Sequence, residues 1–329
     1  MVRTGAHAYL KYGWEDSTFG GSSTVDKKFG VNDRFTSLTL ANNRMNLPQL
    51  NQNTLHSFAY GQQQGSANVS FTLSNPWVFG AVLGAPTTAG SSTYTHTYET
   101  NPSAGGFNLP KTVRTIQIES GIDGASTDVV RTFKCCILNT LNISSSVGGT
   151  VDATADITYG VESAPSTTLG SAPTEPTLEF PYTFAHAELY IGGNVVAQCQ
   201  DANINITQNA ELLYGLNSNQ AVDAYKRVLD ITGSFSYAWK DKTLLEKVLE
   251  QIKQGSSSGT YSETIGGSPE FQLTFQKSST DKIVITGSGL SISDYGITGY
   301  EAVNPLFEDI SWQMKTVKVV ATNNQSAEE

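Results

Sequence analysis

The stretch Phe71-Thr-Leu-Ser-Asn-Pro-Trp-Val-Phe-Gly-Ala-Val-Leu83 decides the fold, because a later part of the chain repeats its order of elements. A short alternating strand is followed by a compact apolar segment that begins with a helix start signal. The segments Phe235-Ser-Tyr237 and Asp241-Lys-Thr-Leu-Leu-Glu-Lys-Val-Leu249 repeat this strand and helix. A gapless alignment superposes the apolar positions of the two helices. A duplicated unit built mostly of strands favours an assembly protein over an enzyme.

Each copy of the unit predicts one helix. In the first, over residues 75–83, Asn75 suits the N-cap, Pro76 the first helical position and Gly84 a left-handed C-terminal position. The second, over residues 241–254, has an apolar stripe at helical spacing, made of Leu244, Leu245, Val248, Leu249 and Ile252. Each helix is expected to flank a sheet.

The rest of the chain alternates apolar and polar residues between Gly-rich, Asn-rich and Pro-rich turns, which is typical of antiparallel strands. The clearest hairpin turn is Val147-Gly-Gly-Thr150, because glycines supply the positive φ angles of a tight turn. Strands are expected at residues 8–12, 35–40, 69–73, 94–98, 113–120, 129–138, 140–147, 150–159, 187–191, 195–197, 202–207, 229–237, 261–265, 271–275, 283–293 and 307–320.

The predicted fold is mainly β, with two tandem antiparallel β-sandwich or barrel domains, each carrying one flanking α-helix. The Pro-rich segment between Glu162 and Glu179 lacks apolar periodicity and is interpreted as a linker. The predicted parts are an extended N-terminal arm at 1–35, a first domain at 36–162, the linker at 163–179, a second domain at 180–322 and a polar tail at 323–329. Long loops are expected at 42–68 and 208–226.

Composition limits the partners of the protein. The chain has 329 residues, of which only 15% are charged, a formal net charge of −10 and a sequence pI of about 4.9. A basic groove that grips nucleic acid is therefore not expected. The sequence has no apolar run of about 18 residues and no apolar signal-peptide core near Met1, so we expect a soluble protein made in the cytoplasm.

The sequence contains no motif that predicts a catalytic, cofactor-binding or metal site. The four histidines are isolated, and His96 lies in Tyr94-Thr-His-Thr-Tyr98, which predicts a solvent-facing or interface row of aromatic side chains. The segment Asp201-Ala-Asn-Ile-Asn205 resembles the start of a calcium loop but lacks the glycine and the closing acid. Cys135, Cys136 and Cys199 are interpreted as small buried or half-buried side chains without disulfides. We therefore predict that the protein is not an enzyme.

The opening Tyr12-Gly-Trp-Glu-Asp-Ser-Thr-Phe-Gly20, followed by Lys28-Phe-Gly30, resembles the start of tail tube proteins of tailed viruses of bacteria and archaea. The same order of elements follows, with a strand, a long loop, a strand, a short helix ending in Leu83-Gly84, the His96-to-Tyr98 strand and a closing hairpin. The resemblance extends over most of the chain.

That resemblance implies a structural virion protein that polymerises into stacked rings, forming the hollow tail tube through which viral DNA reaches the host. With two tube domains per chain, three copies would close a ring with pseudo-sixfold symmetry, so the implied partners are other copies, other tail proteins and DNA that passes without specific binding. The implied location is the virion tail, after synthesis in the host cytoplasm and without membrane insertion. An alternative function is a β-rich receptor- or glycan-binding module of a tail tip or fibre.

Candidate contacts between subunits come from the arm and the two long loops. The arm and the first loop contain Trp14, Phe19, Leu50, Leu55, Phe58 and Tyr60, and the second loop contains Leu212, Leu213 and Tyr214. Trp14 is the tryptophan expected to be available at the surface. An acidic and uncharged polar lumen would repel phosphates weakly and let DNA slide.

Overall fold

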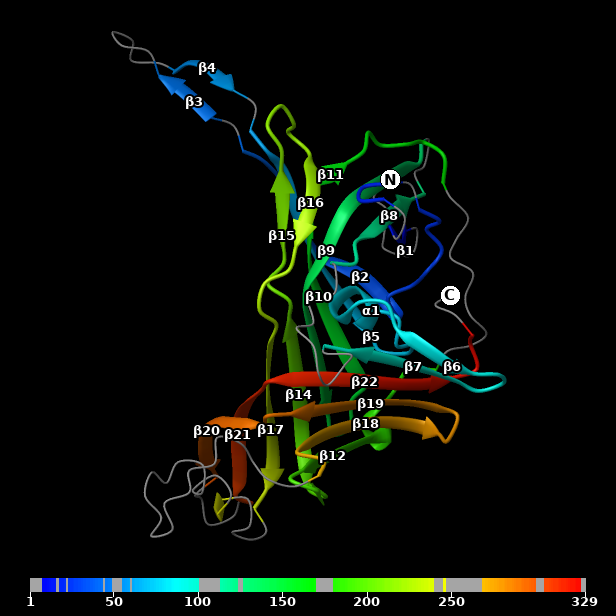
Figure 1. Cartoon of the computed structure of the whole chain (residues 1–329), viewed down its shortest axis with the longest axis vertical. Helices are drawn as coiled ribbons and strands as arrows, with labels where there is room; N and C mark the ends of the chain where they lie inside the picture. Colours follow the sequence, from blue (N-terminus) through cyan, green and yellow to red (C-terminus); the bar gives the residue numbers. More distant parts are fainter. Residues whose placement is uncertain are drawn as a thin grey trace, which may run out of the picture.

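The structure is a computed structural model, shown in Figure 1. It describes residues 8–15, 18–21, 23–43, 45–48, 55–59, 61–100, 113–123, 127–169, 180–239, 245–246, 268–299 and 305–326. The described part is mainly antiparallel β-structure arranged as two layers, which confirms the predicted fold class.

One layer is a large sheet of eleven strands. Its main path runs in the order β2 (Val31–Asn42), β5 (Gln63–Thr72), β10 (Val151–Tyr159), β9 (Val129–Ser146), β14 (Cys199–Thr207), β17 (Asp230–Ala238), β21 (Phe307–Met314) and β20 (Ser291–Thr298). Three further strands attach beside the N-terminal half of β9, and these are β1 (Ala8–Trp14), β8 (Ile116–Ile122) and β11 (Val161–Glu162).

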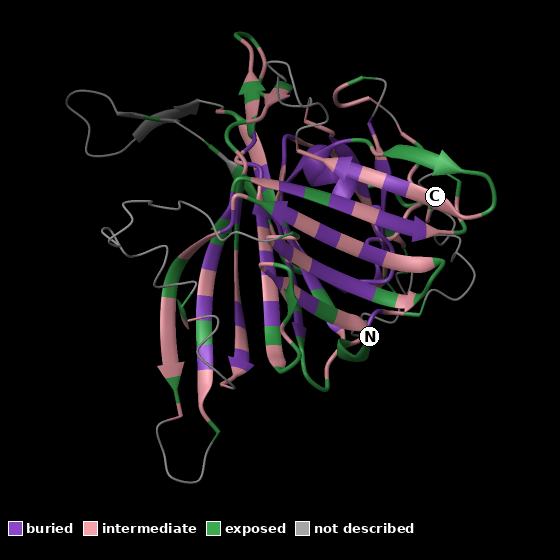
Figure 2. Ribbon diagram, turned by 60° about the horizontal axis from the view of Figure 1, so that its bottom comes forward, coloured by how far each residue is buried: buried purple, intermediate pink, exposed green. Residues whose placement is uncertain are grey.

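The other layer is a sheet of seven strands that crosses the first, as Figure 2 shows. Its order is β13 (Asn194–Val195), β12 (Ala187–Ile191), β18 (Phe271–Ser278), β19 (Asp281–Ser288), β22 (Thr316–Asn323), β7 (Tyr94–Glu99) and β6 (Thr87–Gly90). The buried apolar side chains of both layers meet in one core cluster. The remaining elements are the helix α1 (Phe79–Leu83), the 3₁₀ helix Phe184–His186, and the hairpins β3 (Met45–Pro48) with β4 (Leu55–Ala59) and β15 (Glu211–Tyr214) with β16 (Ala221–Tyr225).

Strand order repeats between the two halves of the chain. In the large sheet, the order β2-β5-β10-β9 of the first half matches β14-β17-β21-β20 of the second. The pairing also repeats in detail, because a bulge leaves Asn139 unpaired between β10 and β9 and leaves Ser293 unpaired between β21 and β20. Both halves also insert one hairpin between their first two strands of this order.

The two halves share both sheets. Strand β9 of the first half pairs with β14 of the second in the large sheet, and β7 of the first half pairs with β22 of the second in the other sheet. The predicted linker is described only up to residue 169. The residue boundaries of the two domains remain predictions.

The bend in β9 explains why two adjacent cysteines are both buried. Cys135 has a φ of 54°, which breaks the alternation of an extended strand, and Cys135 and Cys136 are 1% and 0% exposed. The Glu15 carboxylate holds the bend, with Oε1 accepting from the Cys135 backbone N–H at 3.1 Å and Oε2 from Gly20 N–H at 3.1 Å. Burial raises the pKa of Glu15. All three cysteines are free thiols.

The first predicted helix begins later than expected. The α-helix spans Phe79–Leu83, and it follows a tight turn in which Phe79 N–H donates to Pro76 O at 3.1 Å. The Asn75 side chain accepts from the Trp77 backbone N–H at 3.3 Å, so it caps this turn rather than the helix. Gly84 has a φ of 94°, a left-handed conformation as predicted. The second predicted helix lies almost entirely outside the described residues, although Leu245 and Glu246 are helical.

The predicted aromatic row on β7 does not face solvent. His96 and Tyr98 are both 0% exposed, and the His96 ring meets Trp77 edge-on at a centroid distance of 4.9 Å. The prediction was wrong because β7 lies beside β22 inside a sheet of the sandwich, which turns this face toward the core. The polar ring atoms are satisfied locally, since Nδ1 lies 2.8 Å from Thr88 Oγ1 and Nε2 lies 3.1 Å from Asn323 Oδ1.

The two segments expected to be long loops contain strands. The hairpins β3–β4 and β15–β16 occupy them, and β2 and β5 extend further into the first segment than the alternation of the sequence indicates. Figure 1 shows that β3–β4 projects away from the rest of the molecule. Short strands in arms of this kind carry too few apolar residues for periodicity to reveal them.

Candidate functional site: the polar face of the large sheet

Each main strand of the large sheet turns one set of side chains to the core and the other set outward. On β10, Val151, Ala153, Ala155, Ile157 and Tyr159 are buried, whereas the residues between them are exposed or half-buried. The same alternation holds along β14 and β21. The outward set therefore forms one continuous surface, which we call the polar face.

The polar face consists almost entirely of hydroxyl, amide and carboxylate side chains. The strand registers place its residues in rows across the sheet, and one complete row reads Arg34, Ser70, Thr154, Asn142, Asn205, Thr232 and Gln313. A neighbouring row reads Asn68, Asp156, Thr140, Thr207 and Asp230. No large apolar side chain interrupts these two rows.

Hydrogen bonds between strands order this surface. Asn203 Nδ2 donates to Ser234 Oγ at 2.7 Å, and Ser234 N–H donates back to Asn203 Oδ1 at 3.0 Å. Thr39 Oγ1 lies 2.7 Å from Ser66 Oγ, and the Asn68 amide donates to Asp156. Cross-strand ladders of this kind fix the polar groups in place and leave few free to capture a ligand.

The charge of the polar face is negative. Six exposed aspartates lie on it, and they are Asp152, Asp156, Asp201, Asp230, Asp294 and Asp309. Burial raises the pKa of Asp201, and the nearby Asp309 charge raises it further. Within the eight strands of the main path, with β9 taken from Cys136 onward, Arg34 on the edge strand β2 is the one basic residue. A polyanion near this surface meets repulsion and no basic groove.

The structure brings only some of the predicted contact residues to a surface. Trp14 is half-buried against the core, and the Arg114 guanidinium lies 3.6 Å from its ring centroid. Phe19 is half-buried in a turn. In β15, Leu213 is 41% exposed, whereas Leu212 and Tyr214 are half-buried. Leu50 and Tyr60 lie outside the described residues, and Leu55 and Phe58 lie in β4, where only the backbone is described.

Two surface features were missed by sequence reasoning. The tip of hairpin β15–β16 exposes Leu216 fully, at 103%, and the hairpin also exposes Val222 at 53%. On the edge strand β2, Leu40 is 50% exposed. An alternating pattern predicts that Leu40 is buried, and only the position of β2 at the sheet edge shows that it is not.

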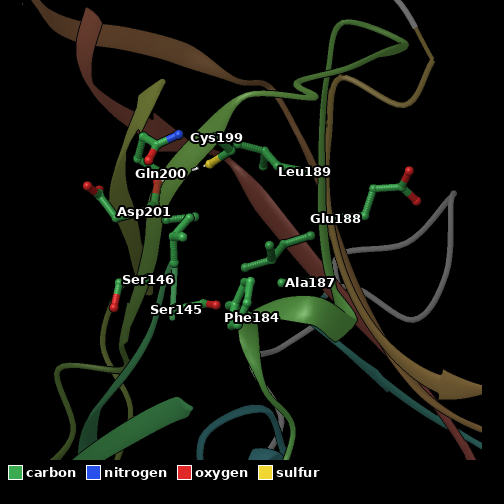
Figure 3. A pocket seen from close by; sticks show the side chains of 12 residues that line it. Ser145, Ser146, Phe184, Ala187, Glu188, Leu189, Cys199, Gln200 and Asp201 are labelled. Carbon is green, nitrogen blue, oxygen red and sulfur yellow. Dashed lines mark hydrogen bonds between the residues drawn. The ribbon is translucent and has the colours of Figure 1, made fainter. Parts of the chain in front are cut away.

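One pocket is a second candidate for a functional site. It lies between the layers where β9, β12 and β14 come together, and Figure 3 shows Cys199 pointing into it while the Glu188 carboxylate points away. The thiol donates to the Asp201 backbone oxygen at 3.1 Å. Burial raises the pKa of Cys199 to about 12, so the thiolate needed for nucleophilic attack is scarce at neutral pH.

The described residues supply no other reactive cluster. Among them, no group of three His, Cys, Asp or Glu side chains is placed to hold a metal ion. No helix within the described ranges is long and apolar enough to cross a membrane.

One buried acid gives a testable pH dependence. Glu308 lies in the core, 0% exposed, and its Oε1 accepts from Tyr295 Oη at 2.5 Å. Burial raises its pKa to about 7. Because the unfolded carboxyl ionises near pH 4.5, the folded state holds the proton more tightly, and the free energy of unfolding must fall as pH rises from about 5 to about 7.

We expect the free energy of unfolding of the Glu308→Gln variant to decrease less over this pH range than that of the unmodified protein, by on the order of 1–3 kcal/mol. Chemical denaturation of the variant and of the unmodified protein at several pH values measures this difference. Burial also raises the pKa of Asp33 to about 6. Because Asp33 is present in both proteins, its contribution to the pH dependence cancels in the difference between them. Parallel pH profiles for the two proteins would show that Glu308 is not the titrating group.

The fold is a two-layer β-structure whose strand order repeats between the two halves of the chain, and the outer face of its large sheet is ordered and acidic. The chain belongs to the phage tail tube protein family, whose model matches residues 5–314. No curated protein matches the chain. Membership of this family makes it a structural tail tube protein and a component of the virion.

Proposed function

We propose that copies of this chain assemble into rings of three, and that stacked rings form the hollow tube through which viral DNA is delivered to the host. Each ring presents six similar halves, two from each chain, and therefore has pseudo-sixfold symmetry. The protein acts as a conduit without enzymatic activity, is made in the host cytoplasm and meets other tail proteins at the ends of the tube.

The observation that carries this proposal is the polar face of the large sheet. It has six exposed aspartates, Arg34 is the one basic residue of its strands when β9 is taken from Cys136 onward, and its hydroxyl and amide groups are tied into cross-strand ladders. A lumen lined by this face repels phosphates weakly and offers few free donors to hold them. DNA can then slide along it without specific binding.

Contacts between stacked rings are assigned to the two hairpins. Leu213, Leu216 and Val222 expose apolar side chains on β15–β16, and β3–β4 projects away from the molecule. Exposed apolar residues gathered on an arm are typical of a surface that a partner covers. The predicted contacts at Leu212, Leu213 and Tyr214 lie on β15, and Leu55 and Phe58 lie on β4.

Negative-stain microscopy of the purified protein across a concentration series tests the proposal. Hollow tubes or stacked rings are expected, either spontaneously or after addition of tail-tube seeds. Discrete particles that stay monomeric at high concentration and after seeding would contradict the proposed function.

A further inference from the structure

We infer that a pocket on the outward face of the seven-stranded sheet binds a neutral sugar. The pocket lies where β12 and β18 meet the 3₁₀ helix Phe184–His186 and the segment that follows β13. The inference goes beyond the proposed function and concerns the single chain. It can therefore fail while the chain still assembles into tubes.

Strand alternation places this pocket on the side of the sandwich opposite the polar face. On β18, Leu273 and Phe275 are buried in the core. Thr274 and Gln276 alternate with them and therefore lie on the outward face. Glu188 of β12 stands directly opposite Thr274, and Figure 3 shows its carboxylate pointing away from the pocket between the layers. In the proposed tube, whose lumen is lined by the polar face, this side of the molecule faces outward.

The pocket has the size of a site for a small molecule. Its volume is about 560 Å³, and ligand pockets commonly measure about 300–1,000 Å³. Four polar side chains line it, and they are His186, Glu188, Thr274 and Gln276. A space of this size holds a monosaccharide or a disaccharide.

The acceptor of the pocket is held in place by a neighbour on the same strand. Tyr190 Oη donates to Glu188 Oε2 at 2.9 Å, which orients the carboxylate. This bond leaves Oε1 to accept from a ligand. A hydroxyl group that donates to a carboxylate forms a short, charge-assisted hydrogen bond.

Two donors are fixed in the same way. Thr274 Oγ1 accepts from Gln272 Nε2 at 3.0 Å, so the hydroxyl proton of Thr274 remains to be donated. His186 Nδ1 accepts from the Thr183 backbone N–H at 3.0 Å, so the neutral ring carries its proton on Nε2. The pocket therefore combines one oriented acceptor with two oriented donors.

A sugar matches this combination because each of its hydroxyl groups both donates and accepts. One hydroxyl can donate to Glu188 while its neighbours accept from the two donors, and the Gln276 amide offers both functions. The small apolar side chains of Ala185, Val195 and Ala197 complete the lining. Val195 is 46% exposed, and the C–H face of a sugar ring would cover it.

The charge of the lining selects against other ligands. Glu188 is the one charged side chain among the residues that line the pocket. An anionic ligand would meet this carboxylate without a lysine or arginine of the lining to offset it. A wholly apolar ligand would cover the polar groups and leave them unpaired, which costs free energy.

Saturation-transfer NMR on the purified protein tests the inference. The probes are glucose, galactose, N-acetylglucosamine and lactose, with glucuronate as the anionic counterpart of glucose. At least one of the four neutral sugars is expected to bind with a dissociation constant on the order of 1 mM. Glucuronate is expected to bind at least tenfold more weakly than that sugar.

Two variants connect the binding to this pocket. Glu188→Gln removes the charged acceptor at nearly constant size, and Ala197→Trp fills the pocket from an exposed position. Each is expected to weaken sugar binding at least tenfold. Glu99→Gln is the matched control, because it makes the same change on β7 of the same sheet, where Glu99 pairs with Lys318 at 2.8 Å. It is expected to bind the sugar normally.

Circular dichroism establishes that the variants are folded, and if one pocket variant is not, the other carries the comparison. Binding of none of the four neutral sugars overturns the inference. Unchanged binding by a folded pocket variant, or tighter binding of glucuronate, also overturns it. None of these outcomes bears on tube formation, which microscopy reports separately.

Discussion

Replacing Leu40 by aspartate is expected to leave a folded protein that no longer forms rings or tubes. Leu40 is 50% exposed on β2, which ends the main path of the large sheet, and closure of the proposed ring would bury it against the next copy. Burial of an unpaired carboxylate costs several kcal/mol, and each 1.4 kcal/mol changes an association constant tenfold. The concentration needed for assembly should therefore rise at least 100-fold, as measured by sedimentation and microscopy.

Thr39→Asp is the matched control, because it adds the same charge one residue away, on the polar face that already carries aspartates. This variant is expected to assemble. Circular dichroism and thermal unfolding establish that both variants are folded. Normal tube formation by a folded Leu40→Asp protein would show that β2 is not an interface.

Reversing the charge of Asp152 and Asp156 to lysine is expected to produce tubes that retain DNA. Both aspartates are exposed on the polar face, and the change repeats in every copy of every ring. Lysines that neutralise phosphates release counterions, so the retention should weaken steeply as salt concentration rises. Virions carrying this variant should release their DNA more slowly, and infectivity should fall by about tenfold or more.

Two controls separate the sign of the charge from its position. Asp152→Asn with Asp156→Asn keeps the polarity of the face, and we expect near-normal DNA release. Glu188→Lys places a lysine at an exposed position on β12, in the other sheet, where DNA would not meet it. If the double lysine tubes release DNA as fast as the unmodified ones, the lumen is lined by a different surface.

Much of the fold could be predicted from alternation and turn residues. The hairpin at Val147-Gly-Gly-Thr150 joins β9 to β10 as expected, and the strands predicted at 94–98, 150–159, 187–191 and 229–237 lie within one residue of β7, β10, β12 and β17. The repeat seen in the sequence agrees with the strand order that recurs in the two halves of the large sheet, while its second helix lies almost entirely outside the described residues.

Bends were harder to predict than strands. The sequence predicts one strand at 283–293, but the chain turns at Gly289, whose φ is 69°, so that β19 lies in one sheet and β20 in the other. Conversely, β9 is one bent strand where two are expected. In β9 the bend replaces the alternation with a run of four buried residues, 135–138, and such a run is also typical of a straight buried strand, so the sequence does not reveal the bend.

The chemistry of the polar face could be predicted from the sequence, but the residues that form this face could not. The low content of charged residues, the negative net charge and the many hydroxyl and amide side chains indicated a polar surface that does not bind nucleic acid tightly. Which residues share a face depends on register between distant strands, such as Asn142 with Asn205, and a single sequence does not encode that pairing locally. The exposure of Leu40 depends on which strand ends the sheet, so it too needed the structure.

In the proposed ring, each chain supplies two equivalent positions. An averaged top view of isolated rings, by negative-stain or cryo-electron microscopy, tests it most directly. Three chains per ring are expected, seen as six similar lobes around a central hole, with a strict threefold and an approximate sixfold axis. Rings of six chains with twelve lobes, or particles without a central hole, would contradict it.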